Sequence, residues 1–484
     1  MAYYPTQKDF ALLRRKNKEV YTKVELLNKN YKVIDVIIGS LVNDSFSINS
    51  ESVQRRTYSC DIHVANSTFL IGNDKKIWMD KYIRVYYGIK ASDITWYLLG
   101  TYTYLDANYT CDLSTNIALS LSCADLMADY DGTKNGEIDG YKLTIPAGED
   151  IRESIIGLLK AAGITNYNVE DIGREIPYDL EFADTTTYCD VWKKICELYD
   201  SWEFFFDIEG RFIWRQIPTG LNEPYILDDT VFHNYGLIIN ESQNNTFQNI
   251  YNVTEVWGKV LELSNEDRFC SEGITYANNI YRVTLSDVTS LDNIDNLTKI
   301  ALTVPAANLA EAKVQINSFS PLPIVRDDGS PIEKGALQAN TTYVFMYRRV
   351  LNGSVQNALY LLGQYQAYGI YKETNPDCPF SIGNLGYEIK HRVNYDNLYS
   401  DDLCFNQAEY LTYQTTAMLD TINLECVFIP WLDVNQKVQY TSLNSHQTNQ
   451  YIIKEISWST SGGTMQLTLY RFLESFSYVK NRRR

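Results

Sequence analysis

Histidine is the side chain best suited to acid–base and metal chemistry near neutral pH, and this sequence has only four: His63, His233, His391 and His446. None of them has a second histidine at metal-ligand spacing, and the HExxH, GxSxG and P-loop motifs are absent from the sequence. His63 falls on the polar face of an alternating segment, where we expect a solvated surface side chain. The histidines therefore predict neither a metal centre nor a nucleophilic triad.

A loop at 131–139 contains residues that resemble the start of a calcium-binding loop. Asp131, Thr133, Asn135, Gly136 and Asp139 occupy early positions of that motif. Its twelfth position should be a bidentate Glu, but here it is Lys142, and no pair of helices is expected on either side. We therefore expect a polar turn and no metal site.

The carboxylates and cysteine thiols also show no pattern that predicts a catalytic or metal-binding site. Acidic pairs such as Glu170 with Asp171 arise by chance among 60 acidic residues, and nothing places a raised-pKa acid near a base. Nine cysteines lie between Cys60 and Cys426 without a CxxC pair, a pattern typical of reduced, buried thiols in a protein made in the cytosol. We expect no catalytic, cofactor-binding or metal-binding residue and no enzymatic activity.

The aromatic run Trp202–Phe206 has the residue types of a carbohydrate-binding platform. It lies between an expected helix and an expected glycine turn, however, and a second aromatic run, 211–214, follows that turn. Aromatic runs on both sides of a glycine turn are typical of a hairpin, so we expect these rings in a hydrophobic core.

Composition limits the class of protein. The chain has 484 residues, enough for roughly three domains, and 45% hydrophobic residues provide ample cores. Its formal net charge of -17 argues against a protein that wraps nucleic acid, because phosphate binding needs a basic surface, but not against one that DNA passes without adhering. No apolar leader follows the basic N-terminus and no run of 18 apolar residues occurs, so we expect neither a secretory signal nor stable membrane insertion.

Hydrophobic periodicity divides the chain into three stretches. To about residue 130, apolar residues alternate with polar ones over 57–64, 83–89 and 117–123, which predicts an antiparallel barrel or sandwich. From 141 to about 220, helical spacing predicts one helix from Ile151 to Ala162 and another beginning near Thr187, followed by the aromatic hairpin. From about 245 to the end, strands return, with one helix over 401–419 capped by Ser400.

A weak internal repeat is visible, and residues near 285–375 look inserted. Trp96 and Gly100 precede the alternating segment 117–123, as Trp458 and Gly462 precede the alternating segment 465–469. The spacing differs between the two, so repetition is a hypothesis only.

Three segments span most of the chain outside 285–375 and carry a set of short motifs. They contain Ser47-Ile48-Asn49, Arg55-Arg56-Thr57 and Trp96–Tyr102; Ile145–Gly148, Ala162-Gly163-Ile164, Ile195–Tyr199 and Phe206–Gly210; and Tyr395–Ser400, Ile429–Asn435 and Tyr451–Ser457. In their order and spacing, these motifs together resemble the baseplate hub proteins of tailed bacteriophages, which are related to siphophage tail-associated proteins.

The resemblance implies an α+β, mainly β fold, with two tube-type antiparallel β-barrel domains flanking a small α+β domain. The barrels are expected at 1–140 and, with one helix, at 245–284 with 376–484; the α+β domain is expected at 141–244, and an inserted β-rich module at 285–375. The chain ends shortly after its last expected strand, so a C-terminal peptidase or lysozyme extension is not expected.

The resemblance also implies a structural hub of a phage tail tip or baseplate. A homotrimer would supply six barrels, join the tail tube or distal tail protein to a central spike, fibre or tape measure protein, and line a channel through which DNA passes without specific binding. The expected location is the virion, after assembly in the host cytoplasm. Two alternatives stay open: a tail-tip peptidase or lysin that degrades the cell wall, and a host-receptor or glycan-binding tip protein that uses 285–375.

Overall fold

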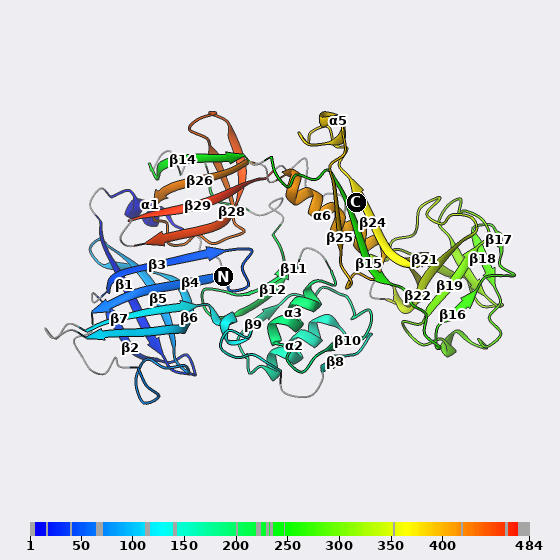
Figure 1. Ribbon diagram of the computed structural model, residues 1–484, viewed down its shortest axis with the longest axis horizontal. Coiled ribbons are helices and arrows are strands. Elements are labelled where there is room, and N and C mark those ends of the chain that lie inside the picture. Colours follow the sequence, from blue (N-terminus) through cyan, green and yellow to red (C-terminus); the bar gives the residue numbers. More distant parts are fainter. Residues whose placement is uncertain are drawn as a thin grey trace.

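The computed structural model describes residues 5–15, 18–38, 41–63, 71–111, 117–138, 143–199, 202–218, 224–228, 232, 236–245, 247–351, 354–417, 420–459 and 463–472. The described chain is mainly β with a few helices, which confirms the predicted mainly β, α+β class. It is elongated: strands from both ends of the sequence form one end of the molecule, a β-rich module forms the other, and two α/β units lie between them (Figure 1).

The N-terminal part, which we call the first half-barrel, is a short helix and a run of antiparallel strands in the order β3-β4-β7-β6-β5-β1-β2. The predicted alternation is confirmed where it is described: Tyr58, Cys60 and Ile62 are buried, while Thr57 and Ser59 are exposed. Val64 lies outside the described residues. The elements are α1 (Gln7–Leu13), β1 (Glu19–Leu27), β2 (Val33–Ile38), β3 (Leu41–Asn49), β4 (Arg56–His63), β5 (Tyr82–Lys90), β6 (Ile94–Cys111), β7 (Ile117–Ala124) and the 3-10 helix η2 (Leu126–Asp129).

Strands near the C-terminus, with two from the middle of the chain, form the second half-barrel. Antiparallel pairing of β28 with β3 places Trp458 opposite Phe46 and joins the halves into one 13-stranded sheet within the described residues. A single hydrophobic core runs through both halves, which lie against each other in Figure 1. The strands are β13 (Tyr225–Leu227), β14 (Ile238–Asn245), β26 (Asp420–Val427), β27 (Lys437–Thr441), β28 (Thr448–Ser459) and β29 (Thr464–Phe472).

The first α/β unit follows the first half-barrel. The predicted cap of its second helix is confirmed, because Thr187 and Asp190 form a reciprocal capping box. Trp192 of that helix packs on Phe204 and Phe212, so the aromatic run contributes to the core as predicted. The elements are β8 (Leu143–Ile145), α2 (Ile151–Ala161), β9 (Tyr167–Val169), β10 (Leu180–Phe182), α3 (Tyr188–Cys196), β11 (Trp202–Phe206) and β12 (Phe212–Gln216).

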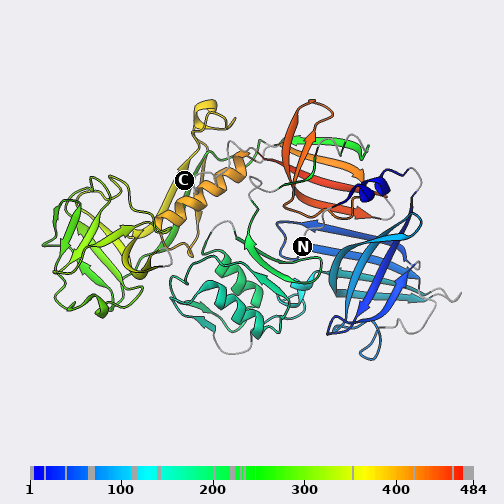
Figure 2. The ribbon, with the colours of Figure 1, turned by 180° about the vertical axis from the view of Figure 1, so that it is seen from behind.

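The second α/β unit is a three-stranded sheet with one long helix across one face, seen from the helix side in Figure 2. Glycines let the layers meet: a Cβ on Gly369 would lie 2.1 Å from the backbone nitrogen of Phe405. The Ser400 hydroxyl accepts a hydrogen bond from the Leu403 N–H at 3.3 Å, which confirms the predicted cap. The elements are β15 (Val253–Val260), β24 (Gln366–Lys372), the short helix α5 (Ile382–Leu385), β25 (Lys390–Asn394) and α6 (Asp401–Ala417).

Between β15 and β24 the chain leaves this unit and builds a separate module with its own hydrophobic core. Its eight strands form one sheet in the order β16-β19-β22-β23-β21-β20-β18-β17. The elements are β16 (Arg268–Cys270), β17 (Thr275–Ala277), β18 (Ile280–Val283), the 3-10 helix η3 (Leu291–Asn293), β19 (Lys299–Val304), β20 (Lys313–Ile316), β21 (Leu322–Val325), β22 (Thr341–Leu351) and β23 (Ser354–Gly363).

Strand pairing departs from the predicted domain limits at three places. The segment 245–284 was assigned to the second barrel, but its strand β15 pairs with β24 and β25. The strands β13 and β14, assigned to 141–244, pair instead within the second half-barrel. The inserted module begins at β16, before residue 285, and ends at β23, before residue 375. Alternation identifies a half-buried strand but does not identify its neighbour in a sheet, which explains these differences.

Within the described residues, no helix is long and apolar enough to cross a bilayer.

Candidate functional site

One face of the long sheet is polar across both half-barrels, and it is the candidate functional surface. Register aligns small uncharged side chains row by row: Ser457 lies opposite Ser47, Ser47 opposite Thr57, and Ser45 opposite Ser59. The next strands continue these rows. We call the following set the polar face: Asn43, Ser45, Ser47 and Asn49 of β3; Thr57, Ser59 and Asp61 of β4; Ser120 and Ser122 of β7; Asp106 and Asn108 of β6; Glu455, Ser457 and Ser459 of β28; Thr464, Gln466 and Thr468 of β29; and Asn423 and Glu425 of β26.

Several hydroxyl groups of the polar face form hydrogen bonds across neighbouring strands. Ser45 Oγ lies 2.8 Å from Ser59 Oγ, and Ser47 Oγ lies 2.8 Å from Thr57 Oγ1. The hydroxyl of Ser120 donates to the Asp61 carboxylate at 2.6 Å. Cross-strand pairs of this kind stabilise the sheet and leave few donors free for a passing ligand.

The polar face is hollowed and carries negative charge only. A groove of about 620 Å³ runs over β3, β4, β7, β28 and β29, and an adjoining one of about 240 Å³ extends toward β6. The charged members of the polar face are Asp61, Asp106, Glu425 and Glu455, and none of its members is Lys or Arg. Such a surface has no cation with which to hold a phosphate backbone.

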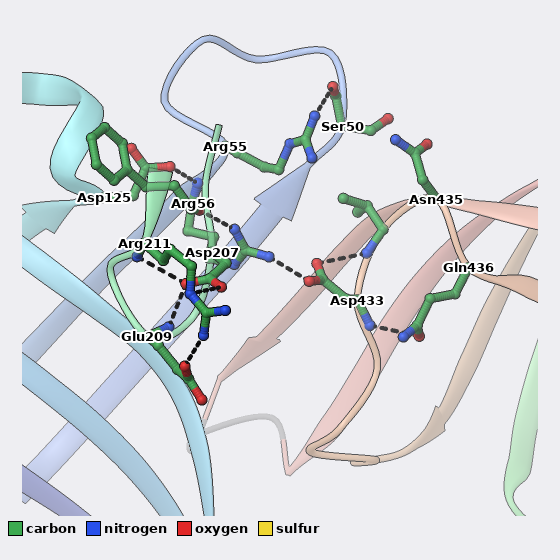
Figure 3. Close-up of polar contacts among 12 residues, drawn as sticks. Ser50, Arg55, Arg56, Asp125, Asp207, Glu209, Arg211, Asp433, Asn435 and Gln436 are labelled. Atoms are coloured by element: carbon green, nitrogen blue, oxygen red, sulfur yellow. Dashed lines mark hydrogen bonds and ion pairs between the residues drawn. The ribbon is translucent and has the colours of Figure 1, made fainter. Parts of the chain in front are cut away.

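A buried polar cluster fixes the position of this face relative to the first α/β unit. Arg55 and Arg56, at the corner between β3 and β4, are buried where both half-barrels meet β11 and β12, and Arg56 reaches toward Asp433 (Figure 3). Arg56 Nη1 donates to the Phe206 carbonyl oxygen at 2.7 Å, and its Nη2 pairs with Asp433 Oδ2 at 2.5 Å. Arg55 Nη2 pairs with Glu203 Oε2 at 2.7 Å. We call Arg55, Arg56, Asp125, Glu203 and Asp433 the arginine node.

Electrostatics in the arginine node follow from its burial. Desolvation disfavours the ionised form of Glu203, but the guanidinium groups of Arg55 and Arg215 outweigh it and lower the pKa of this carboxyl. Burial raises the pKa of Asp125 to about 6, although its carboxylate accepts the backbone N–H groups of Arg56 and Met127 at 2.9 and 3.0 Å. The arginine node therefore contains two different acids: the pKa of Glu203 is lowered by its arginine partners, whereas the pKa of Asp125 is raised toward neutral pH by burial.

Three segments that carry the resemblance to hub proteins meet in this node: 55–57, 206–210 and 429–435. No role for the two consecutive arginines was predicted from the sequence. The sequence does contain a signal for this node: two arginines stand at the start of an expected strand and Glu203 stands inside an aromatic run. Burying either charge is costly unless the arginine and the glutamate pair with each other.

A second polar cluster, the tyrosine node, attaches the inserted module. The hydroxyls of Tyr199 and Tyr399 lie 3.1 Å apart, and the Tyr399 hydroxyl donates to Asp327 Oδ1 at 2.8 Å. Arg348 Nη2 donates to the Tyr399 hydroxyl at 3.3 Å, and Arg174 Nη1 lies 3.5 Å from Asp327 Oδ2. These residues come from the first α/β unit, the module and the loop before α6, so the node links three parts of the chain.

In the part of the chain that the structure describes, the histidine, cysteine and acidic side chains do not gather into a catalytic or metal site. Within the described residues, no cluster of three or more His, Cys, Asp or Glu side chains could hold a metal ion. The eight cysteines whose side chains the structure describes are free thiols, and burial raises the pKa of Cys60 and Cys189 to about 12, which is opposite to the activation a nucleophile needs. His63 is exposed, as predicted, whereas His233 lies outside the described residues.

In the loop at 131–139 that resembles a calcium-binding loop, the side chain of Lys134 contacts the first half-barrel. Lys134 Nζ donates to Thr103 Oγ1 at 2.6 Å and lies 3.0 Å from Asp129 Oδ1. Asp131 accepts hydrogen bonds from the Gln54 side chain and the Thr133 N–H. Asp139 and Lys142 lie outside the described residues. These contacts favour the polar turn that the sequence predicted.

Comparison with known proteins relates the whole architecture to phage tails. A family model described as a domain of unknown function, DUF5048, matches residues 377–476, and no curated protein matches the sequence. The 43 kDa tail protein of prophage MuSo2 from Shewanella oneidensis has a TM-score of 0.52 at 8% identity, over 93% of this chain and 98% of that one. A tail protein from Neisseria meningitidis MC58 has a TM-score of 0.50 at 8% identity, over 94% and 98%.

At such low identity the likeness concerns the fold alone, and it extends over nearly the full length of each chain. The chain therefore has the fold of phage tail proteins, and the resemblance indicated by the sequence is confirmed at that level.

Proposed function

We propose that this protein is a structural hub of a phage tail tip or baseplate and that its polar face lines the channel for DNA. The observation that carries this proposal is the sheet shared by the two half-barrels, with a hollowed face of small, mutually hydrogen-bonded side chains and no cation among its members. A wall of this kind repels phosphates through its carboxylates, so DNA slides along it.

Exposed sheet edges support assembly into a ring. β2 and β14 end the long sheet, and within the described residues no strand pairs with the outer edge of either. On β2, Val33, Ile34, Val36 and Ile38 are each 41–51% exposed. A long apolar edge is an aggregation hazard unless a neighbour covers it, and a head-to-tail ring covers every edge. With two half-barrels in each copy, a homotrimer presents six, which fits a sixfold tube on one side and a threefold spike or fibre on the other.

Native mass spectrometry of the purified chain tests this assembly. The proposal expects trimers, and expects Val36→Lys with Ile38→Lys to reduce them to monomers without loss of the circular dichroism spectrum. The matched control is Phe269→Lys, on an exposed position of the inserted module. Only monomers, dimers or tetramers at tens of micromolar wild-type protein would contradict the hub role.

The proposed hub has no catalytic function. The raised pKa values of the Cys60 and Cys189 thiols support this part of the proposal, as does the sequence, in which no histidine has a second histidine at metal-ligand spacing. Incubation with peptidoglycan tests it: turnover that one carboxylate or cysteine substitution abolishes would favour a lysin instead. The virion location and the contacts with tube, spike and tape measure proteins belong to the same proposal.

A further inference from the structure

The two α/β units share a sheet topology. In the first unit the central strand β12 pairs antiparallel with β11 and parallel with β9. In the second unit the central strand β15 pairs antiparallel with β24 and parallel with β25. Helices cover one face of each sheet, namely α2 with α3 in the first unit and α6 in the second (Figure 2). The two sheet faces that the helices leave uncovered, one in each unit, can therefore be compared.

In the first unit, an arginine from another part of the chain occupies the face opposite the helices. The guanidinium carbon of Arg55 lies 3.8 Å from the centre of the Phe205 ring. Its Nη2 pairs with Glu203 Oε2, while Glu203 Oε1 accepts the Nε–H of Arg215, directly opposite on β12, at 2.8 Å. We call the binding surface formed by Phe205, Glu203 and Arg215 the first seat: an aromatic ring lies beside a carboxylate that a cross-strand arginine orients. Its occupant is Arg55, an arginine on a turn.

The second unit has the same components on its corresponding face. Glu255 lies opposite Arg392 in register, and Arg392 Nε donates to Glu255 Oε2 at 2.9 Å. Trp257 lies opposite Tyr368, with ring centroids 4.5 Å apart, and the charges of Glu255 and Arg392 act on the Tyr368 hydroxyl. The seat therefore again pairs aromatic rings with a carboxylate oriented by an arginine.

This second seat has no occupant among the described residues. Glu255 Oε1 has no hydrogen-bond or ion-pair partner there, in contrast to the corresponding oxygen of Glu203. Trp257 is 39% exposed, and neither Trp257 nor Tyr368 belongs to a hydrophobic core. The nearby Lys372 and Lys390 both pair with Glu388, at 2.6 and 3.2 Å, and the Glu255 side chain, 12% exposed, pairs with Arg392 alone among the described residues. The sheet face that carries this seat is turned toward the viewer in Figure 1.

We propose that the face formed by Glu255, Trp257, Tyr368 and Arg392 is a docking site for an arginine on a turn of a partner protein. A guanidinium stacks on the aromatic rings and offers paired N–H donors to Glu255, which a lysine ammonium cannot do equally well. The first seat holds an arginine on a turn, and the net charge of -17 favours a basic partner protein over a second copy as the source of such an arginine. Tryptophan, tyrosine and arginine are the residue types that dominate binding energy at interfaces.

The natural occupant of the first seat supplies the probe. A fluorescein-labelled, lactam-cyclised peptide copying residues 49–58 is titrated with the full-length protein at low salt and followed by anisotropy. We expect saturable binding that Glu255→Gln and Trp257→Ala each weaken at least tenfold. The peptide with lysine in place of both arginines should bind at least fivefold more weakly. Phe269→Ala, 59% exposed on the inserted module, is the matched control and should bind as wild type does.

Three outcomes would overturn this inference. One is the absence of saturable binding, or affinities of Glu255→Gln and Trp257→Ala within twofold of wild type. Another is binding of soluble peptidoglycan fragments that Trp257→Ala abolishes while the arginine peptide does not bind, which would make the face a carbohydrate site. The last is a loss of self-association in Trp257→Ala, measured by sedimentation, without any peptide binding to wild type. The trimer measurement is separate, so this inference and the hub role can fail independently.

Discussion

Arg56 and Asp433 form an ion pair across 377 residues of sequence, with Nη2 and Oδ2 2.5 Å apart. Arg56 begins β4 of the first half-barrel, and Asp433 lies between β26 and β27 of the second. The side chain of Arg56 is 1% exposed, whereas that of Asp433 is 32% exposed, so a desolvated guanidinium depends on a carboxylate at the rim of the node. The pair therefore couples the stability of the two half-barrels.

Replacing Asp433 with Asn should destabilise the protein strongly. The substitution keeps the shape but leaves the buried guanidinium without its closest counter-charge, and weakening the pairing of a buried charged donor in this way costs about 1–3 kcal/mol. Urea unfolding, followed by circular dichroism, measures the change. Asp74→Asn removes the carboxylate of a surface pair whose Asp side chain is 69% exposed, and should stay within about 0.5 kcal/mol of wild type. Equal effects of the two substitutions would show that the arginine node does not stabilise the junction.

Asp401, the first residue of α6, should make stability depend on pH. Burial raises the pKa of Asp401 to about 7, while Oδ1 accepts the Tyr368 N–H at 2.9 Å. Because the folded-state pKa lies above the unfolded value, the protonated form favours folding at low pH, and this contribution is lost as pH rises through about 7. Asp401→Asn should therefore be more stable than wild type at pH 8, with a difference that shrinks toward pH 5. Urea midpoints at both pH values measure it, and a difference that grows toward pH 5 would contradict the assignment.

Gly369 and Gly157 should respond oppositely to alanine. A Cβ on Gly369 would lie 2.1 Å from the Phe405 nitrogen, so α6 must move away from β24 and stability should fall by about 3 kcal/mol or more. A Cβ on Gly157, inside α2, meets nothing within 4 Å, and alanine there should raise stability by about 0.5–1 kcal/mol. Urea unfolding of both variants provides the comparison. An unchanged Gly369→Ala variant would mean that α6 does not pack directly on the sheet.

The sequence predicted local features well and long-range pairing poorly. Alternation assigned Ser59 and Ser122 to the polar side of their strands, because a strand exposes every second residue to one face. It could not show that β28 pairs with β3, about 400 residues away, because the same alternation suits any neighbour in the sheet. The arginine node was missed for a related reason: a buried arginine differs from a surface one only through partners that the fold supplies. Strand pairing also reassigned β13, β14 and β15 among the parts of the chain.

The polar face should gain DNA affinity when cations are added to it. Ser59, Ser122 and Ser457 are exposed on β4, β7 and β28, and all three line the same groove. Wild type should bind a 30-base-pair duplex negligibly, whereas the triple lysine variant should bind it with a log–log salt slope of about -2.7, since each neutralised phosphate contributes about -0.9. Fluorescence anisotropy between 50 and 200 mM salt measures this slope.

The matched control for the lysine variant adds the same charge elsewhere. Ser271, Thr275 and Gln338 are exposed on the inserted module, and lysines there change the net charge equally without a shared concave surface. We expect the groove variant to bind DNA more tightly than this control, because the groove concentrates the three cations along one path and focuses their field. Equal affinities would show that net charge alone governs binding, and would contradict a channel-lining role for the polar face.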